Sequence, residues 1–240
     1  MVCNTKLIQT KLDIGVRFNA IAHRYDLLAA LNPGYEKHLR WSAKRMALSN
    51  QARVLDLCCG TGISTTALSQ TYPDATIDGI DISEGMLEHA RAKFYQANVR
   101  FVHGDAMSPQ ALGIEGPYDG VLMAYGLRNV PDADACLSGI RSLLKPGGVL
   151  CLHEYSVRNS LKSRMIWSAV NFVIIWPSGL LTSPRSDIYR YLWRSVLDFD
   201  GVRELEGRLR GAGYTDVHTE TMDGWQKDIV HSFVARAPKG

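Results

Sequence analysis

The sequence predicts an α/β fold of the Rossmann-like kind, with a seven-stranded, mostly parallel sheet and helices on both faces. Apolar strand-like runs alternate with helical patterns along the chain, which is typical of parallel strands joined by crossover helices. A glycine-rich turn, Asp56-Leu-Cys-Cys-Gly-Thr-Gly62, follows the apolar run Arg53-Val-Leu55, as in nucleoside-binding folds of this class. A chain of 240 residues with 46% hydrophobic residues can bury one large core, so a single domain over residues 1–240 is expected.

Apolar periodicity and breaker residues place the elements in order. The first five strands are expected near residues 52–57, 76–80, 99–103, 118–124 and 149–155. Crossover helices are expected over residues 63–72, 84–95 and 133–144, the last ended by Lys145-Pro-Gly-Gly148. A final helix near 199–212 and two strands near 214–221 and 228–235 complete the sheet.

Two segments fall outside this alternation. Residues 1 to about 50 are expected to form a helical lid, and residues 157 to about 195 form an apolar insertion rich in tryptophan. The large apolar residues of this insertion are expected to belong to the core by default, yet they would also suit contact with a prenyl tail or a membrane surface. These residues are Trp167, Phe172, Trp176 and Leu180.

Charge and cysteine usage exclude several classes of protein. The formal net charge is +3 and the basic residues are scattered, so no nucleic acid is expected as a partner. The odd number of cysteines shows no metal-ligand spacing, so they are interpreted as reduced thiols and no metal is expected. Without a secretory signal or a membrane-spanning stretch, the chain is expected to be cytoplasmic. Peripheral membrane contact and a homodimer stay open as hypotheses.

The glycine turn favours S-adenosylmethionine over NAD as the bound nucleoside. A dinucleotide-binding turn would carry a third glycine where this chain has Thr65, whereas an acid before a shortened turn suits a ligand without a pyrophosphate. A turn of this kind also occurs in α/β proteins that bind no nucleotide. The residues of the turn predicted to contact the cofactor are Asp56, Cys58, Gly60, Thr61 and Gly62.

Acidic residues follow the second and third strands, where ligands bind in open α/β sheets. Asp81 is predicted to accept hydrogen bonds from ribose hydroxyls; its alternative role is to cap the next helix, which Ser83 can do instead. Asp105 is predicted to accept the adenine amino group, with the Ala106 backbone beside it, unless it only forms a turn. Ile82 is also predicted to contact the cofactor, and Met86 is expected near the adenine ring, although it also suits a helix core.

Several motifs recur together and carry a resemblance to a known family. They are Ile21-Ala-His-Arg-Tyr-Asp26, Ala124-Tyr-Gly-Leu-Arg-Asn-Val130, Leu144-Lys-Pro-Gly-Gly148, Leu152-His-Glu-Tyr-Ser156 and Ser186-Asp-Ile-Tyr-Arg-Tyr191. With the glycine turn, they make nearly the whole chain resemble the ubiquinone/menaquinone biosynthesis C-methyltransferases. The Gly-Leu-Arg-Asn segment is the specific part, because class I methyltransferases in general share the other elements.

The resemblance implies an S-adenosylmethionine-dependent methyltransferase acting on a quinol or phenolic ring, such as a demethylmenaquinol or a ubiquinone precursor, prenylated or not. It also implies that Ala124 or Tyr125 lies beside the methionine end of the cofactor. Departures at Cys58, Ala124 and Asn32-Pro-Gly-Tyr-Glu36 keep a methyltransferase for a natural product or another small molecule as an alternative. A second alternative is a protein of this fold that binds the nucleoside without methyl transfer.

Ring methylation requires a carbon made nucleophilic by loss of a hydroxyl proton, and therefore a base or a cationic partner for the oxyanion. Arg128 is the predicted holder of that oxygen, with Asn129 beside it; alternatively Arg128 pairs with Asp132 or Asp134.

Two further side chains are candidates for the chemistry. His153 is a candidate base because the fifth strand ends near the cofactor, although strand alternation can also turn it into packing. Tyr25 in the lid is expected to flank the sulfonium by a cation–π contact, or else to pack within its helix. Glu154 and Tyr155 alternate along the strand, so only one of them is expected to face the site.

Overall fold

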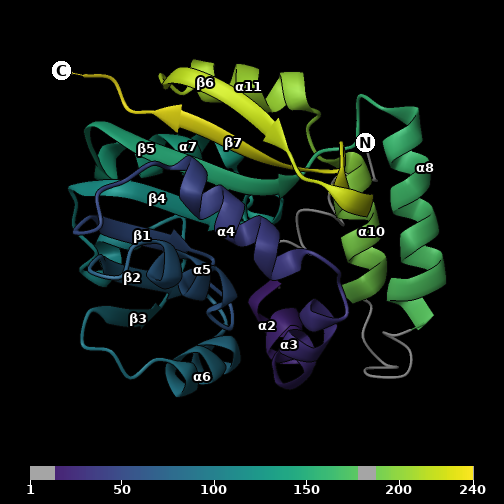
Figure 1. Cartoon of the computed structure of the whole chain (residues 1–240), viewed down its shortest axis with the longest axis horizontal. Coiled ribbons are helices and arrows are strands. Elements are labelled where there is room, and N and C mark those ends of the chain that lie inside the picture. The colour runs from purple at the N-terminus through teal and green to yellow at the C-terminus, as the bar shows by residue number, and fades with distance from the viewer. Residues whose placement is uncertain (1–13, 178–187, 240) are drawn as a thin grey trace.

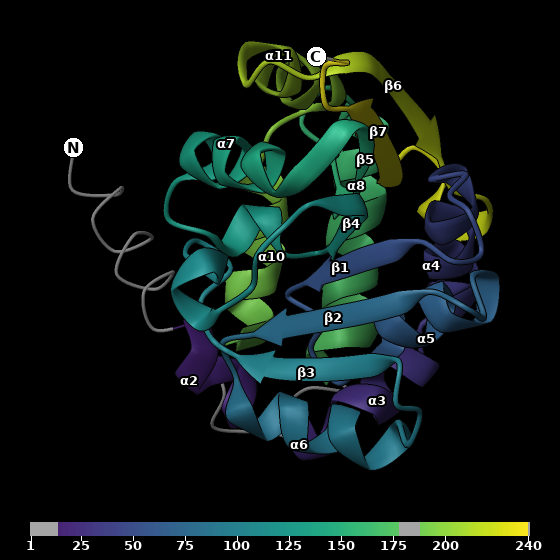
Figure 2. The same ribbon diagram turned by 90° about the vertical axis from the view of Figure 1, so that its left-hand side faces the viewer.

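The computed structural model describes residues 14–177 and 188–239, and within them it contains a seven-stranded sheet between layers of helices (Figures 1 and 2). The strand order is β3-β2-β1-β4-β5-β7-β6, and β7 alone runs antiparallel to its neighbours among the described strands. The strands are β1 (Arg53–Leu57), β2 (Thr76–Asp81), β3 (Val99–His103), β4 (Tyr118–Ala124), β5 (Leu144–Tyr155), β6 (Thr215–Thr221) and β7 (Val230–Arg236). The predicted fold class is confirmed.

Helices occupy the predicted crossover positions. They are α5 (Ile63–Thr71), α6 (Glu84–Lys93), α7 (Ala133–Leu143) and α11 (Val202–Gly211). One strand boundary was wrong: β5 begins at Leu144, which pairs with Tyr118, and the ladder resumes at Val149 after an irregularity. The Lys145-Pro-Gly-Gly148 segment therefore ends α7 and forms a bulge inside the strand, since a single register cannot accommodate the extra residues.

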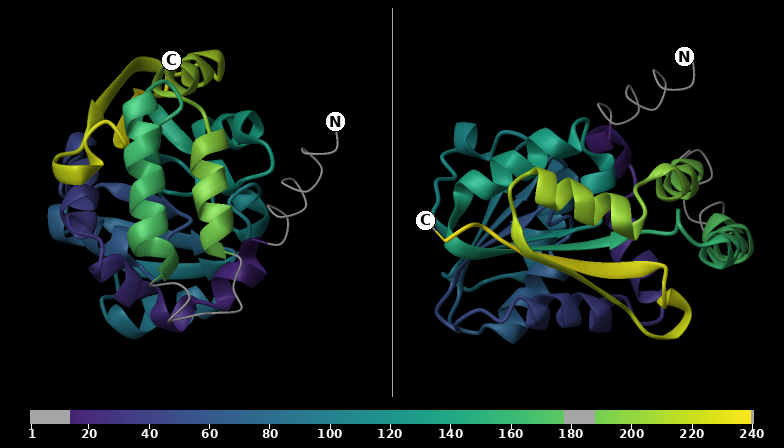
Figure 3. Two further views of the ribbon diagram at one scale, coloured as in Figure 1. Left: turned by 90° about the vertical axis from the view of Figure 1, so that its right-hand side faces the viewer. Right: turned by 90° about the horizontal axis from the view of Figure 1, so that it is seen from above.

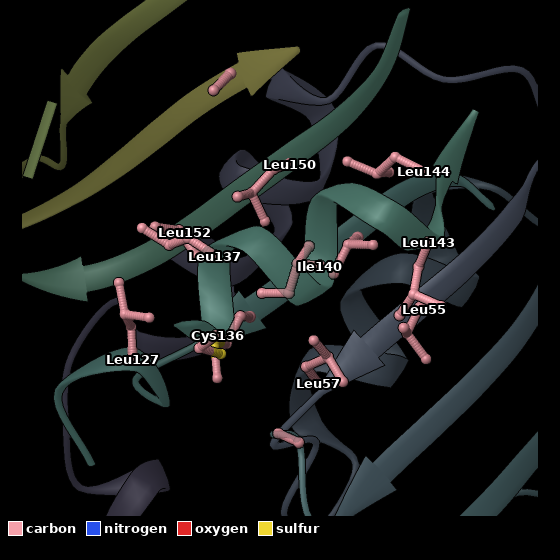
Figure 4. Packing of buried hydrophobic residues seen from close by; sticks show 14 of the residues in the cluster. Leu55, Leu57, Leu127, Cys136, Leu137, Ile140, Leu143, Leu144, Leu150 and Leu152 are labelled. Carbon is pink, nitrogen blue, oxygen red and sulfur yellow. The ribbon is translucent and has the colours of Figure 1, made fainter. Parts of the chain in front are cut away.

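Both faces of the sheet carry apolar side chains, which helices cover. Leu55 and Leu57 of β1 and Leu150 of β5 lie on the face covered by α7, where Leu137 and Ile140 pack against them (Figure 4). On the other face, strand residues pack against α5 and against α4 (Tyr35–Arg45). Successive strand residues point to opposite faces, so strands buried on both sides read as nearly continuous apolar runs.

The predicted lid of residues 1–50 divides into two parts. Helices α2 (Ile14–Asn19) and α3 (Ala22–Ala30) pack against α6 through Ile21, Ala22 and Met86 and cover the end of the sheet. Helix α4, by contrast, packs on the sheet through Ala43. Residues 1–13, and with them Cys3, lie outside the described residues.

The apolar insertion forms a pair of helices, α8 (Leu161–Val170) and α10 (Ile188–Asp198), which lie side by side in Figure 3. A π-helical turn, η3 (Asn171–Ile175), continues α8. Trp167 is fully buried and its indole donates to the Trp193 carbonyl at 3.3 Å, whereas Phe172 is exposed. Leu180, Ser186 and Asp187 lie outside the described residues. No helix within 14–177 or 188–239 has the length and apolar composition to cross a membrane.

Candidate active site

A cavity of about 450 Å³ lies at the carboxyl ends of β1, β2, β4 and β5, where open α/β sheets bind ligands. Helices α2 and α3 cover it from one side, and η3 and α10 cover it from the other. Its wall is mainly apolar, with a few polar side chains at the strand ends, in the loops and on the covering helices. Those polar side chains include Asn32, Asp81, Arg128, Asn129 and Tyr191.

The glycine turn brings backbone close to this cavity. Cys58, Gly60 and Gly62 have φ values of 58°, 56° and 84°, in the left-handed region that favours glycine. Cys58 and Gly60 line the cavity, and a Cβ added to Gly60 would meet no atom within 4 Å. The turn therefore leaves open space directly over its backbone.

Asp81 holds the glycine turn next to β2. Its carboxylate accepts the Gly60 N–H and the Ser83 N–H, both at 2.8 Å, and burial raises its pKa. Ser83 is the residue that caps α6, with its hydroxyl oxygen accepting the Met86 N–H at 3.2 Å. Asp81, Ile82 and Met86 all line the cavity.

Asp56, a predicted cofactor contact, is not part of the cavity wall. It is fully buried beneath the turn, where its carboxylate accepts the hydroxyls of Ser64 and Thr65 at 2.8 and 2.7 Å. Burial raises its pKa to about 7, and within the described chain its second oxygen has no hydrogen-bond partner. Thr61 is also turned away, because its hydroxyl donates to Asp26 of α3 at 2.6 Å.

Asp105, Ala106 and Gly62 are likewise absent from the cavity wall. Asp105 is exposed and accepts the Met107 N–H at 2.9 Å, the turn contact that was its alternative interpretation. Ala106 packs into the same core cluster as the apolar residues of α7, and Gly62 is the N-cap residue of α5.

Arg128 lies in the short helix η2 (Leu127–Asn129) and forms a buried ion pair with Glu154 of β5. The Nη1–Oε1 distance is 2.6 Å, and the two side chains are 5% and 1% exposed. The alternative partners were wrong: Asp132 caps α7, and Asp134 pairs with Arg208. Arg128 lines the cavity, and no described residue accepts a hydrogen bond from its buried Nε.

Backbone and side-chain contacts fix the loop after β4. The Tyr125 carbonyl accepts hydrogen bonds from Arg128 Nη1 at 2.7 Å and from Asn129 Nδ2 at 3.0 Å. Asn129 in turn accepts the Tyr191 hydroxyl at 3.0 Å. The predicted pair Arg128 and Asn129 therefore lies together on one wall of the cavity, tied to α10.

His153 does not touch the cavity. It has no exposed surface, its Nε2 lies 2.9 Å from the Tyr125 hydroxyl, and burial lowers its pKa to about 3. A bound ring cannot reach it, so direct proton abstraction by His153 is incompatible with this geometry. Tyr155, two residues further along the strand, does line the cavity, whereas Glu154 lies behind Arg128.

A group of tyrosines surrounds the polar wall. The hydroxyl oxygens of Tyr25 and Tyr35 share a hydrogen bond at 3.2 Å. The ring of Tyr35 stacks on that of Tyr125 with 5.5 Å between the ring centroids, and the centroids of Tyr125 and Tyr155 are 4.8 Å apart. Burial raises the pKa of each, so all four remain protonated near neutral pH. The sequence indicated Tyr25 and Tyr125 but not Tyr35 or Tyr191, which lie on helices without a strand-end signal.

The chain matches the profile of the "ubiE/COQ5 methyltransferase family" over residues 5–229. It belongs to that family. It is 35% identical over 215 residues to the demethylmenaquinone methyltransferases of Staphylococcus aureus strains JH9 and Newman, covering 86% of this chain and 87% of each relative. The predicted methyltransferase activity is thereby confirmed.

Solved structures with the same fold are more distant in sequence. The [4+2]-cyclase SpnF is 19% identical with a TM-score of 0.68, over 95% of this chain and 96% of that one. Phosphoethanolamine N-methyltransferase 2 of Haemonchus contortus, in complex with S-adenosyl-L-methionine, is 18% identical with a TM-score of 0.66, over 92% of this chain and 57% of that one. At these identities the likeness shows the fold alone.

Proposed function

We propose that this methyltransferase adds a methyl group to a ring carbon of a quinol, such as a demethylmenaquinol. The names of the Staphylococcus aureus relatives support this substrate class. The observation that carries the proposal is Arg128: a buried guanidinium on the cavity wall with an Nε that no described residue satisfies. A buried donor without a partner is uncommon in proteins, so a ligand oxygen is the natural acceptor.

S-adenosylmethionine is the proposed methyl donor, and it supplies an electrophilic methyl group. Asp81 would accept the ribose hydroxyls, and Ile82 and Met86 would flank the adenine ring. The open space over Gly60 gives room for such a ligand at the turn. Cys58, Ala124 and Tyr125 line the same cavity and would lie near the methionine end. Asp105 and Ala106, in the turn that follows β3, the neighbour of β2, stay proposed contacts for the adenine edge.

The acceptor ring would lie between the Arg128 wall and Tyr25. Arg128 holds a permanent positive charge, and Glu154 behind it fixes the plane of the guanidinium. A ring oxygen gains negative charge as its proton leaves and the ring carbon becomes nucleophilic, so a fixed cation at that oxygen lowers the barrier. Tyr25 would contribute its ring face to the sulfonium, as its place in the cavity wall allows.

A prenyl tail would leave the cavity through its apolar rim. Leu31 and Ile174 line the cavity and are also 56% and 51% exposed, and Leu27 and Val173 extend the exposed apolar surface on either side. Exposed apolar groups in such number are typical of surfaces that meet a lipid or a partner. We propose that this rim rests on a membrane surface when a prenylated quinol is taken up.

Vesicle binding tests the rim separately from the chemistry. We expect the protein to sediment with phosphatidylglycerol vesicles and the double variant Leu27→Asp/Val173→Asp to stay in solution. Neither residue lines the cavity, so the variant should still methylate a quinol without a tail. Equal sedimentation of both proteins would contradict the membrane contact.

Rates of methyl transfer to a panel of acceptors test the substrate class. The panel holds demethylmenaquinols with and without a prenyl tail, ubiquinone precursors, soluble phenols and amines. We expect turnover with quinols and a lower KM for the prenylated ones, because the rim buries apolar surface. Turnover with soluble phenols or amines alone would assign the chain to another small-molecule methylation.

A further inference from the structure

A line of buried polar side chains runs from the cavity through the sheet. It begins at Tyr125, which lines the cavity, and passes to His153 at 2.9 Å and on to Ser42 of α4 at 2.7 Å. Ser42 lies 2.7 Å from Ser232 of β7, and Arg45 donates to Ser232 at 2.8 Å. Neither Ser42 nor Ser232 takes part in cofactor or ring binding as proposed above, so the proposed function does not account for these hydrogen bonds.

The arginine at the far end sets the direction of every hydrogen bond in the line. A guanidinium only donates, so Ser232 accepts from Arg45 and turns its own proton toward Ser42. Ser42 then donates to Nδ1 of His153, the other partner of its hydroxyl among the described residues. A neutral imidazole that accepts at Nδ1 carries its proton on Nε2, and therefore donates to the oxygen of Tyr125.

This direction excludes a proton path from the cavity to the surface. A proton leaving the cavity would have to end on Arg45, which cannot accept one and which pairs with Glu220 at 3.1 Å. His153 would have to pass through its cationic form, whereas it faces Arg45 and the neighbouring histidines His38 and His231 in a buried setting. The line holds protons in place instead of moving them.

The consequence falls on the Tyr125 hydroxyl. Because its oxygen already accepts from His153, its own proton turns away from His153 and toward the Tyr155 hydroxyl. Both tyrosines line the cavity, so a ligand oxygen bound there would take the place of Tyr155 as the acceptor of that proton. The Tyr125 backbone is held in the left-handed region at φ 55°, and its N–H donates to the His153 carbonyl at 2.7 Å. Such a conformation is strained in a residue other than glycine, and strained residues of this kind cluster at functional sites.

We propose that Tyr125 is a further catalytic residue, whose hydroxyl donates a hydrogen bond to the ring oxygen of the acceptor. His153 and Ser42 are positioning residues, which keep the Tyr125 proton on the cavity side. The inference rests on the proposed function, since it concerns an oxygen of the acceptor ring. Together with Arg128, Tyr125 gives the oxyanion two donors from one wall of the cavity.

Kinetics of matched variants give the first test. Loss of an oxyanion donor typically lowers kcat by 10²–10³-fold, so we expect about a 100-fold lower kcat for Tyr125→Phe with KM nearly unchanged. His153→Leu should lower kcat in the same way, and His153→Gln should restore most of it because an amide accepts from Ser42 and donates to Tyr125. Tyr214→Phe is the control: it removes another buried tyrosine hydrogen bond, to Leu137, outside the cavity. An unchanged kcat for Tyr125→Phe, or no rescue by His153→Gln, overturns the proposal.

A bound chromophore gives a second test that needs no turnover. We would titrate 4-nitro-1-naphthol bound in the presence of S-adenosylhomocysteine, following the naphtholate absorbance. The donor from Tyr125 should hold the pKa of the bound naphthol about one unit lower in the wild type than in Tyr125→Phe, a tenfold stabilisation of the anion. Equal values in the two proteins overturn the donor role. A wild type with this shift but no methyl transfer to any quinol would contradict the proposed function alone.

Discussion

At the scale of single residues, the Arg128–Glu154 pair joins chemistry to stability. Arg128→Ala would remove the proposed oxyanion partner and leave Glu154 buried without a counter-charge, which costs roughly 3–5 kcal/mol. We therefore expect both turnover and thermal stability to fall in Arg128→Ala. In Arg128→Ala/Glu154→Gln, stability should largely return while kcat stays low. Recovery of kcat along with stability would mean that Arg128 acts only through folding.

Asp81 is the residue on which cofactor binding should depend most. Hydrogen bonds to a charged group contribute roughly 1.5–3 kcal/mol, so Asp81→Ala should weaken binding of S-adenosylmethionine by about 10- to 150-fold in calorimetry. Glu88→Ala, which removes an exposed carboxylate on α6, the helix that follows Asp81, is the matched control and should bind as the wild type does. Equal affinities for Asp81→Ala and the wild type would remove the ribose assignment.

Strand order predicted which residues gather at the cavity but not how deep each one lies. Asp81, Arg128 and Tyr125 follow strands and line the cavity as expected. His153 belongs to the same strand end as Tyr155, yet it lies beneath Tyr125, since β5 continues beyond it. Asp56 turns under its own glycine turn to the hydroxyls of α5. How deeply a side chain is buried depends on the elements packed around it, and the local sequence pattern carries no information about them.

At the scale of elements, α7 offers a clean test of local stability. Asp132 caps this helix by accepting the N–H groups of Asp134 and Ala135 at 3.0 Å. Loss of such a cap costs about 1 kcal/mol, so Asp132→Ala should lower Tm by roughly 2–4 °C.

The neighbouring Asp134→Ala should cost less, because it breaks only an exposed pair with Arg208. Both variants should keep full methyl transfer, since neither acid pairs with Arg128. A loss of activity in either variant would contradict the Arg128–Glu154 assignment.

The helices and strands of the core were predictable because their periodicity and breakers are local. The role of α4 was not: its pattern fits a lid as well as a layer, and its packing on the sheet depends on Ala43 meeting residues far along the chain. The same holds for the insertion, where the burial of Trp167 depends on the pairing of α8 with α10.

At the scale of the whole molecule, buried histidines predict a pH-dependent stability. Burial lowers the pKa of His153 to about 3 and that of His231 to about 4, from an ordinary value of 6.5. Below pH 6.5 these two histidines bind protons in the unfolded chain but stay neutral in the native protein. The stability that these groups contribute is therefore complete above pH 6.5 and falls as the pH drops toward 3, by at most about 1.4 kcal/mol per pH unit and histidine.

Asp56 opposes this trend, because its raised pKa makes its contribution fall as the pH rises from 3.8 to about 7. Urea unfolding of the wild type and His153→Gln at pH 4.5 and 7 separates the two effects. The free energy of unfolding should fall less on acidification in His153→Gln, since glutamine does not titrate. The same pH dependence in both proteins would mean that His153 titrates normally in the fold.

Methylation at a ring carbon can be tested by locating a labelled methyl group in the product. Demethylmenaquinol would be incubated with the protein and S-adenosylmethionine carrying a ¹³C methyl group, and the product would be analysed by NMR. We expect the wild type to form a product with the labelled methyl bonded to a ring carbon, and Arg128→Ala/Glu154→Gln to form none. A label on oxygen, or turnover unaffected by that variant, would contradict this expectation.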